Sequence, residues 1–235
     1  MCQSGTREAI LNRINTWADA AESETIFWVS GPAGSGKSTI SRSLARSFAE
    51  TGKLGATYFF KRGEEGRNGT ALIFPTIANQ LINSIPTYRT CLRRSLDKLG
   101  NAKVENKALE EQFKTLIQIP LSELFPNQSE TLTKIIIIDA LDECERYDHV
   151  SRILTLLSRL QPLNTVRLRV FLTSRSAPPI VGAFKDLRKE RATYRCLRLD
   201  EELSDETKSD ISAFLKEICN YQGQLQYHKG SLARL

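Results

Sequence analysis

The chain has 235 residues, of which 40% are hydrophobic and 26% are charged, and its net charge is +6. These values predict one soluble globular domain with a sizeable core. They argue against a membrane protein, because no apolar run approaches the roughly 20 residues of a membrane span. The five scattered cysteines include no C-x-x-C pair, which argues against a disulfide framework or a zinc site. Because the N-terminus lacks a basic-then-apolar signal layout, we expect a cytoplasmic protein.

Helical and strand patterns alternate along the chain. Residues 1–24 form a lead-in segment in which apolar side chains at helical spacing predict a helix over 7–20. We expect residues 25–220 to form one domain, and residues 221–235 form a tail without a clear helical or strand pattern. Within the domain we expect strands at 25–30, 55–60, 134–140, 168–174 and 193–199, helices at 37–50, 75–85, 92–99, 109–117, 147–160 and 204–218, and a polar loop at 61–70. This alternation predicts an α/β fold with a mainly parallel sheet.

A glycine-rich segment joins the first strand to the helix that follows it. The sequence GPAGSGKS, residues 31–38, matches the pattern G-x-x-x-x-G-K-[ST] in the strand–loop–helix context of a phosphate-binding loop. Backbone N–H groups can turn toward one anion only where side chains do not obstruct them, which explains the three glycines. The new helix adds its N-terminal amides. The predicted nucleotide-binding residues are Gly31, Pro32, Ala33, Gly34, Ser35, Gly36, Lys37, Ser38 and Thr39, with Lys37 on the β- and γ-phosphates and Ser38 on Mg²⁺.

The run IIIIDALDEC supplies carboxylates where a parallel sheet opens its ligand crevice. Asp139 ends the apolar strand, and we expect it to hold Mg²⁺ directly or through water. Glu143 is the first candidate for the base that activates water, with Asp142 supporting the metal shell. An alternative stays open for this second pair, because acidic residues also favour the N-terminus of a following helix.

Arg175 follows the expected strand at 168–174. A guanidinium is rich in donors and permanently charged, so Arg175 is a candidate sensor of the γ-phosphate. An ordinary surface arginine at a strand end is the alternative. The candidate catalytic residues are therefore Lys37, Asp142, Glu143 and Arg175.

Together, GPAGSGKST and IIIIDALDEC resemble the NACHT domains of the STAND class of signal-transducing P-loop NTPases. Further blocks are similar, in the same order, to the fungal nephrocystin-like N-terminal group: CQSGTREAILNRINTW, LGATYFFKRGEEGRNG, FPTIANQLINSIPTYR and FLTSRSAPPI. The similarity extends from about residue 2 to about residue 218. It implies a three-layer ASCE-type fold whose mainly parallel, five-stranded sheet has the order 5-1-4-3-2, with helices on both faces.

The resemblance also implies a signalling switch that holds nucleotide at rest and oligomerises on activation, in processes such as innate immunity and heterokaryon incompatibility. It places Asp142 and Glu143 at the hydrolytic water, Arg175 at the γ-phosphate, and Thr6 and Arg7 near the nucleotide base. The expected partners are nucleotide and either a second copy of the chain or full-length relatives, without a specific nucleic acid or a membrane. Family members continue into helical and winged-helix domains. A fragment, a truncated gene product and a short partner of full-length relatives all stay open for this sequence.

Three functions are consistent with these motifs. The first is a weak, Mg²⁺-dependent NTPase, with ATP favoured over GTP because no N/T-K-x-D motif follows the late strands. The second is a nucleotide-binding interaction module without significant hydrolysis. The third is a nucleic-acid binder that uses the positive net charge. It ranks last, because basic and acidic residues alternate along the chain.

Overall fold

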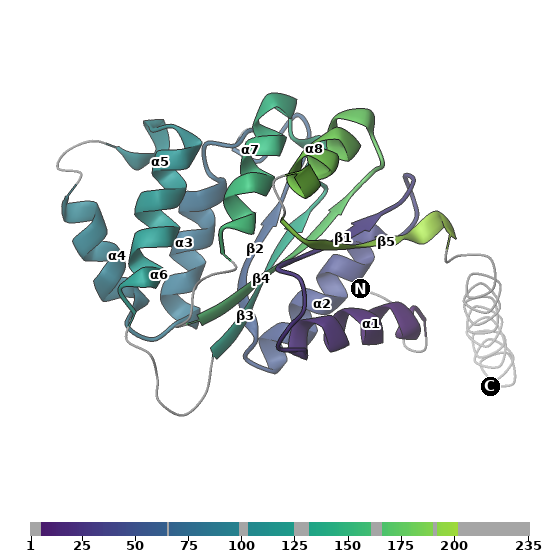
Figure 1. Ribbon diagram of the computed structural model, residues 1–235, viewed down its shortest axis with the longest axis horizontal. Coiled ribbons are helices and arrows are strands. Elements are labelled where there is room, and N and C mark those ends of the chain that lie inside the picture. Colours follow the sequence, from purple (N-terminus) through teal and green to yellow (C-terminus); the bar gives the residue numbers. More distant parts are fainter. Residues whose placement is uncertain are drawn as a thin grey trace, which may run out of the picture.

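The computed structural model describes residues 6–64, 66–98, 103–124, 132–160, 166–189 and 192–201 (Figure 1). The helix expected at 204–218 and the tail at 221–235 lie outside these ranges. The five strands are β1 (Ile26–Ser30), β2 (Leu54–Phe59), β3 (Leu132–Asp139), β4 (Val166–Ser174) and β5 (Tyr194–Arg198). They form one sheet of order β2-β3-β4-β1-β5, in which every neighbouring pair is parallel. Read from the other edge, this is the order 5-1-4-3-2, so the fold expectation is confirmed.

Helices cover both faces of the sheet (Figure 1). They are α1 (Glu8–Asp19), α2 (Lys37–Glu50), α3 (Ile73–Ser84), α4 (Tyr88–Asp97), α5 (Leu109–Phe113), α6 (Ile119–Ser122), α7 (Tyr147–Ser158) and α8 (Pro178–Lys189). The sequence expectations lacked α8, whose two leading prolines resemble a loop. Proline is tolerated in the first turn of a helix, where its missing N–H has no role, and the apolar residues of α8 then fall on one buried face. Among the described residues, no helix is both long and apolar enough to cross a membrane.

Side chains of the strands alternate between two cores. On one face, Trp28, Ile136 and Ile138 pack into a cluster with residues of α3 to α8. On the other face, Phe27 and Ile137 pack with α1 and α2. Burial on both faces requires an apolar residue at nearly every strand position, which explains the continuous isoleucine run of β3.

A π-helical turn, Lys114–Gln118, joins α5 to α6. Its cause is Pro120, which has no N–H to donate and whose ring crowds the carbonyl four residues earlier. Two side chains of α4 replace the lost backbone donors, because Tyr88 donates to Leu116 O and Ser95 donates to Thr115 O at 2.7 Å. The expected helix at 109–117 therefore continues through the proline, to Ser122.

Two cations are buried near the N-terminal ends of the strands. Arg169 in β4 is 2% exposed and donates to the carbonyls of Trp17, Ala20 and Ala21, at the end of α1. Lys134 in β3 donates to Gly52 O, just after α2, at 2.6 Å. The C-terminal end of a helix carries partial negative charge, so these carbonyls offset the charge of each side chain.

Side chains cover the outer edge of β2. Gln80 of α3 accepts from Thr57 N–H at 2.9 Å and donates to Thr57 O at 2.8 Å. Ser84 donates to Gly55 O at 3.2 Å, and Arg67 donates to Phe59 O at 3.1 Å. The carbonyls of Gly55, Thr57 and Phe59 and the N–H of Thr57 are therefore bonded by side chains instead of by another strand.

Candidate functional site

The loop between β1 and α2 has the backbone that the glycine pattern predicts. Gly34 and Gly36 have φ angles of 76° and 87°, in the left-handed region that most side chains avoid. A Cβ at Gly31 would lie 2.9 Å from Ser35 Oγ and 3.1 Å from Leu199 Cβ. Gly36 also caps α2, so this helix starts without a side-chain cap and its first amides can serve an anion. These observations fit a phosphate group at the loop.

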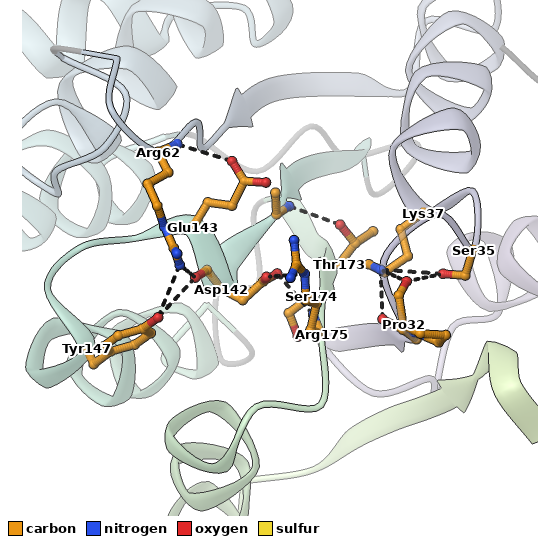
Figure 2. Close-up of polar contacts among 12 residues, drawn as sticks. Pro32, Ser35, Lys37, Arg62, Asp142, Glu143, Tyr147, Thr173, Ser174 and Arg175 are labelled. Atoms are coloured by element: carbon orange, nitrogen blue, oxygen red, sulfur yellow. Dashed lines mark hydrogen bonds and ion pairs between the residues drawn. The ribbon is translucent and has the colours of Figure 1, made fainter.

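Lys37 is the first residue of α2, and its side chain folds back along the loop (Figure 2). Its Nζ donates to Gly31 O and to Pro32 O, both at 2.7 Å, and lies 3.4 Å from Ser35 Oγ. Burial lowers the pKa of Lys37, while the nearby charges of Asp142 and Asp139 act in the opposite direction. The ammonium group is thus held at the loop by neutral carbonyls, which leaves its positive charge for a phosphate. Ser38 and Thr39 follow it in the first turn of the same helix.

Asp139 ends β3 and is 3% exposed. Ser41 of α2 and Thr173 of β4 each donate a hydrogen bond of 2.6 Å to its Oδ1. Within the described part of the chain, both hydrogen bonds to this carboxylate end on Oδ1, so Oδ2 is the oxygen left for a cation or its water. A fixed carboxylate beside the start of α2 suits Mg²⁺, which prefers oxygen ligands.

A sharp turn follows Asp139 and separates the next two acids. Ala140 has a φ of 57°, which a small residue tolerates better than a bulky one, and its N–H donates to Thr173 Oγ1 at 3.0 Å. The 3₁₀ turn Leu141–Glu143 comes next. Figure 2 shows the result, with Asp142 directed toward Arg175 and Glu143 directed toward Arg62.

Asp142 bridges the ends of β3 and β4. Its Oδ1 accepts from the backbone N–H of Arg175 at 2.9 Å, and its Oδ2 lies 3.2 Å from Arg175 Nε. The side chain of Asp142 is 8% exposed, whereas that of Arg175 is 57% exposed. The arginine side chain is therefore largely open to solvent, while its Nε is held by Asp142.

Glu143 is held by the loop that follows β2. Its Oε2 accepts from the backbone N–H of Arg62 at 3.1 Å. The Arg62 guanidinium in turn donates to Asp142 O and to Tyr147 Oη, both at 3.3 Å. Farther along the same loop, Asn68 donates from its side chain to Glu145 at 3.0 Å. The loop thus braces the acidic turn.

The lead-in segment also reaches the phosphate loop. Arg7 precedes α1 and donates from Nη2 to Ser35 O at 3.4 Å. Its backbone has a φ of 60°, and its carbonyl accepts from Leu11 N–H. Thr6 comes directly before it and is partly buried. The structure thus brings Arg7 to the loop.

Three residues of this site had no role in the sequence expectations: Ser41, Thr173 and Arg62. Ser41 lies one helical turn after Lys37, on the same side of α2, and could have been found from that spacing. Thr173 lies next to Ser174 and Arg175 near the end of β4, and the sequence gives no reason to prefer it over them. Arg62 acts through its backbone N–H as well as its side chain, so its residue type carries little signal.

Similarity to known proteins extends over most of the chain. Residues 5–175 match the family described as "Nephrocystin 3, N-terminal". No curated protein matches. Among solved structures, the chain is similar to Cdc6p from Pyrobaculum aerophilum, with 13% identity, a TM-score of 0.48, and coverage of 84% of this chain and 46% of that chain. It is also similar to Pif1 helicase from Candida albicans, with 17% identity, a TM-score of 0.37, and coverage of 85% and 40%.

The chain spans less than half the length of each of these two structures. The family match covers most of the chain, including β1 to β4 and the motifs at Gly31–Ser38 and Asp139, and it confirms the nephrocystin-like part of the resemblance. This chain belongs to the nephrocystin 3, N-terminal family.

Proposed function

We propose that this chain is a Mg²⁺-dependent, ATP-binding domain of the NACHT type that hydrolyses ATP slowly and acts as a conformational switch. The observation that carries this proposal is the joint placement of a phosphate loop, its lysine and a buried aspartate at one end of a parallel sheet. Ser41 of α2 donates to Asp139 of β3 at 2.6 Å, so the helix that starts at the loop is tied directly to the acid. Such sites are characteristic of proteins that bind a nucleoside triphosphate at the carboxyl ends of parallel strands.

The residues of the chain divide the work of binding and hydrolysis. The loop amides and Lys37 would hold the phosphates, and Asp139 with Ser38 would hold the metal. When bound, Mg²⁺ supplies positive charge that offsets the negative charge of the phosphates. Glu143 would accept a proton from water through Oε1, since its Oε2 accepts from Arg62 N–H. Arg175 would face the terminal phosphate.

Equilibrium binding of ATP, ADP and GTP with Mg²⁺ tests this proposal, on the wild type and on Lys37→Ala. We expect ATP to bind more tightly than GTP. The variant should lose about 10- to 100-fold in ATP affinity, because a charge-assisted hydrogen bond contributes about 1.5–3 kcal/mol. Lys53→Ala is the matched control, since Lys53 pairs with Asp19 at the surface. Equal ATP binding by Lys37→Ala and the wild type would contradict the proposal.

One contact favours a second function, a nucleotide-binding interaction module without significant hydrolysis. The carboxylate of Glu143 accepts from Arg62 N–H, in the loop after β2. The same loop is fixed near the acidic turn, because Arg62 also donates to Tyr147 and Asn68 donates to Glu145. This contact keeps one carboxylate oxygen of Glu143 away from a water molecule, which disfavours hydrolysis while the loop stays in place. Steady release of phosphate from ATP by the purified wild type, abolished in Glu143→Gln, would exclude the module. Binding without phosphate release would support it.

Oligomerisation is the remaining part of the switch proposal. We expect ATP to favour a larger assembly than ADP, because a switch must couple the bound nucleotide to association. Light scattering of the wild type with ATP and Mg²⁺, and with ADP and Mg²⁺, measures this. The same mass in both states would contradict a switch in which this chain associates with itself, and would leave full-length relatives as the proposed partners.

A further inference from the structure

Both carboxylate oxygens of Asp142 contact one residue, Arg175. Oδ1 accepts from the Arg175 N–H at 2.9 Å, and Oδ2 lies 3.2 Å from Arg175 Nε. This acid is buried, whereas the arginine is more than half exposed. An acid engaged in this way is poorly suited to bind a metal or to take a proton from water, because both tasks compete with the arginine for the same oxygens.

The main chain before Arg175 is fixed independently of Asp142. Trp28 donates from its indole to Ser174 Oγ at 2.8 Å, and Ser174 O accepts from Gly31 N–H at 3.3 Å. Ser174 is fully buried. Because these contacts already anchor the end of β4, the contact between Asp142 and Arg175 Nε determines chiefly where the guanidinium points.

Arg175 follows directly after a contact with the phosphate loop. Ser174, the residue before it, accepts from Gly31 N–H, and the carbonyl of Gly31 accepts from Lys37 Nζ at 2.7 Å. Figure 2 shows Arg175 lying between Asp142 and the phosphate loop.

We propose that Asp142 is a positioning residue that orients Arg175 toward the terminal phosphate, and that this pair lets the chain distinguish a nucleoside triphosphate from a diphosphate. The inference rests on the proposed function and deepens it. It assigns Asp142 to Arg175 instead of to the metal or to water. Glu143, on the opposite side of the same turn, remains the candidate base.

A double-mutant cycle tests this role by measuring the ratio of ATP to ADP affinity in the full chain with Mg²⁺. The variants are Asp142→Asn, Arg175→Ala and the double variant. We expect each single variant to lower the ratio about 10-fold, and the double variant to equal Arg175→Ala, because Asp142 acts only through the arginine. ADP affinity should change by less than about 2-fold, since ADP lacks the phosphate that Arg175 reads. A general structural defect would lower the affinity for both nucleotides.

Asp148→Asn is the matched control. Asp148 pairs with Arg146 through two similar contacts of 3.1 and 2.8 Å, but this pair is exposed. We expect its ATP-to-ADP ratio to equal that of the wild type. If Asp142→Asn does not fold, Arg175→Lys provides the second test: the ammonium keeps the charge but lacks the planar nitrogens that Asp142 holds, so the ratio should still fall.

The outcomes separate the two proposals. Additive effects of Asp142→Asn and Arg175→Ala would overturn the positioning role, and so would an equal loss of ADP and ATP affinity in Asp142→Asn. A ratio of ATP to ADP affinity in Arg175→Lys equal to that of the wild type would overturn it as well. A wild type that binds neither nucleotide would instead overturn the proposed function, and the positioning role with it.

Discussion

The two ends of the sheet bury charge in opposite ways. At the N-terminal ends of the strands, the cations Arg169 and Lys134 are held by carbonyls at the ends of α1 and α2. At the C-terminal ends, the anions Asp139 and Asp142 are held by hydroxyl groups, a backbone N–H and an arginine. The signs of these charges match the dipole of α2. Its partly positive N-terminus lies at the acidic end of the sheet, and its partly negative C-terminus lies near Lys134.

Under the proposed function, this difference separates residues that stabilise the fold from residues that serve nucleotide binding. The cations at the N-terminal end donate hydrogen bonds to protein carbonyls, and they connect helices to the sheet. The anions at the C-terminal end are arranged around the phosphate loop and Lys37, and the same end carries Glu143. We therefore expect changes at the C-terminal end to alter nucleotide chemistry more than stability. Changes at the N-terminal end should do the reverse.

The largest expected effect is at the C-terminal end, in Glu143→Gln. Removal of the candidate base should lower the rate of ATP hydrolysis about 10²- to 10⁴-fold. The amide oxygen still accepts from Arg62 N–H, so ATP affinity and the melting temperature should stay close to wild type. Phosphate release under saturating ATP measures the rate. Glu145→Gln is the control, and a rate equal to that of Glu143→Gln in this control would break the comparison.

At the N-terminal end, Arg169→Met should destabilise the fold by about 1–3 kcal/mol, because the buried carbonyl at the end of α1 loses its donor. The variant also loses the contact between the guanidinium and the ring of Trp17, 5.6 Å away. Urea unfolding followed by tryptophan fluorescence measures the change. Arg167→Met, on the same strand, is the control. Normal stability together with impaired ATP binding in Arg169→Met would contradict the expectation that the N-terminal end of the sheet serves stability.

Thr173→Val is expected to have a smaller effect, at the C-terminal end. Valine keeps the shape of threonine but loses the bond to Asp139 and the acceptor for Ala140 N–H, at a cost of about 1–2 kcal/mol in stability. Because Asp139 loses one of its two supports, a higher Mg²⁺ concentration should be needed for half-maximal ATP binding. Thr133→Val, near the start of β3, should leave this concentration unchanged. The same Mg²⁺ requirement in both variants would contradict a metal role for Asp139.

The smallest expected effect is a pH dependence at the N-terminal end. Burial lowers the pKa of Lys134 below its ordinary value of 10.5. Below that value the unfolded chain binds more protons at this site than the folded chain does, so this lysine makes stability rise as the pH increases toward 10.5. In Lys134→Met that rise should be reduced. Urea unfolding of both proteins between pH 8 and about 10 measures it, and parallel pH profiles would contradict the assignment.

Much of the fold could be predicted from the sequence, because the apolar patterns of strands buried on both faces are continuous. The five strands were predicted from these patterns, and the order of the sheet was predicted from the family resemblance. The helix α8 and the π-helical turn at Pro120 were missed because proline gives the same local signal in a loop and in a tolerated helical position. The buried position of Arg169 could not be read from an arginine in a strand, since its partners are backbone carbonyls far away in the sequence.

The site was predicted unevenly, for a physical reason. The backbone shape of Gly31–Ser38 depends on its own glycines, so local sequence is sufficient to predict that shape, and the apolar run before Asp139 predicts its place at the end of a strand. The roles of Asp142 and Glu143 depend on which way each side chain turns after Ala140. Their contacts, Arg175 and Arg62, come from other strands and loops, and a pattern of acidic residues cannot distinguish between them.

The covered edge of β2 has a consequence for assembly. An extended peptide from another molecule could not pair with this strand without first displacing Gln80, Ser84 and Arg67 from the backbone. Exposed strand edges are common starting points for cross-β aggregation, so these three side chains act as a barrier to fibre growth at this border of the sheet. An oligomer that extends the sheet beyond β2 would first have to break these contacts.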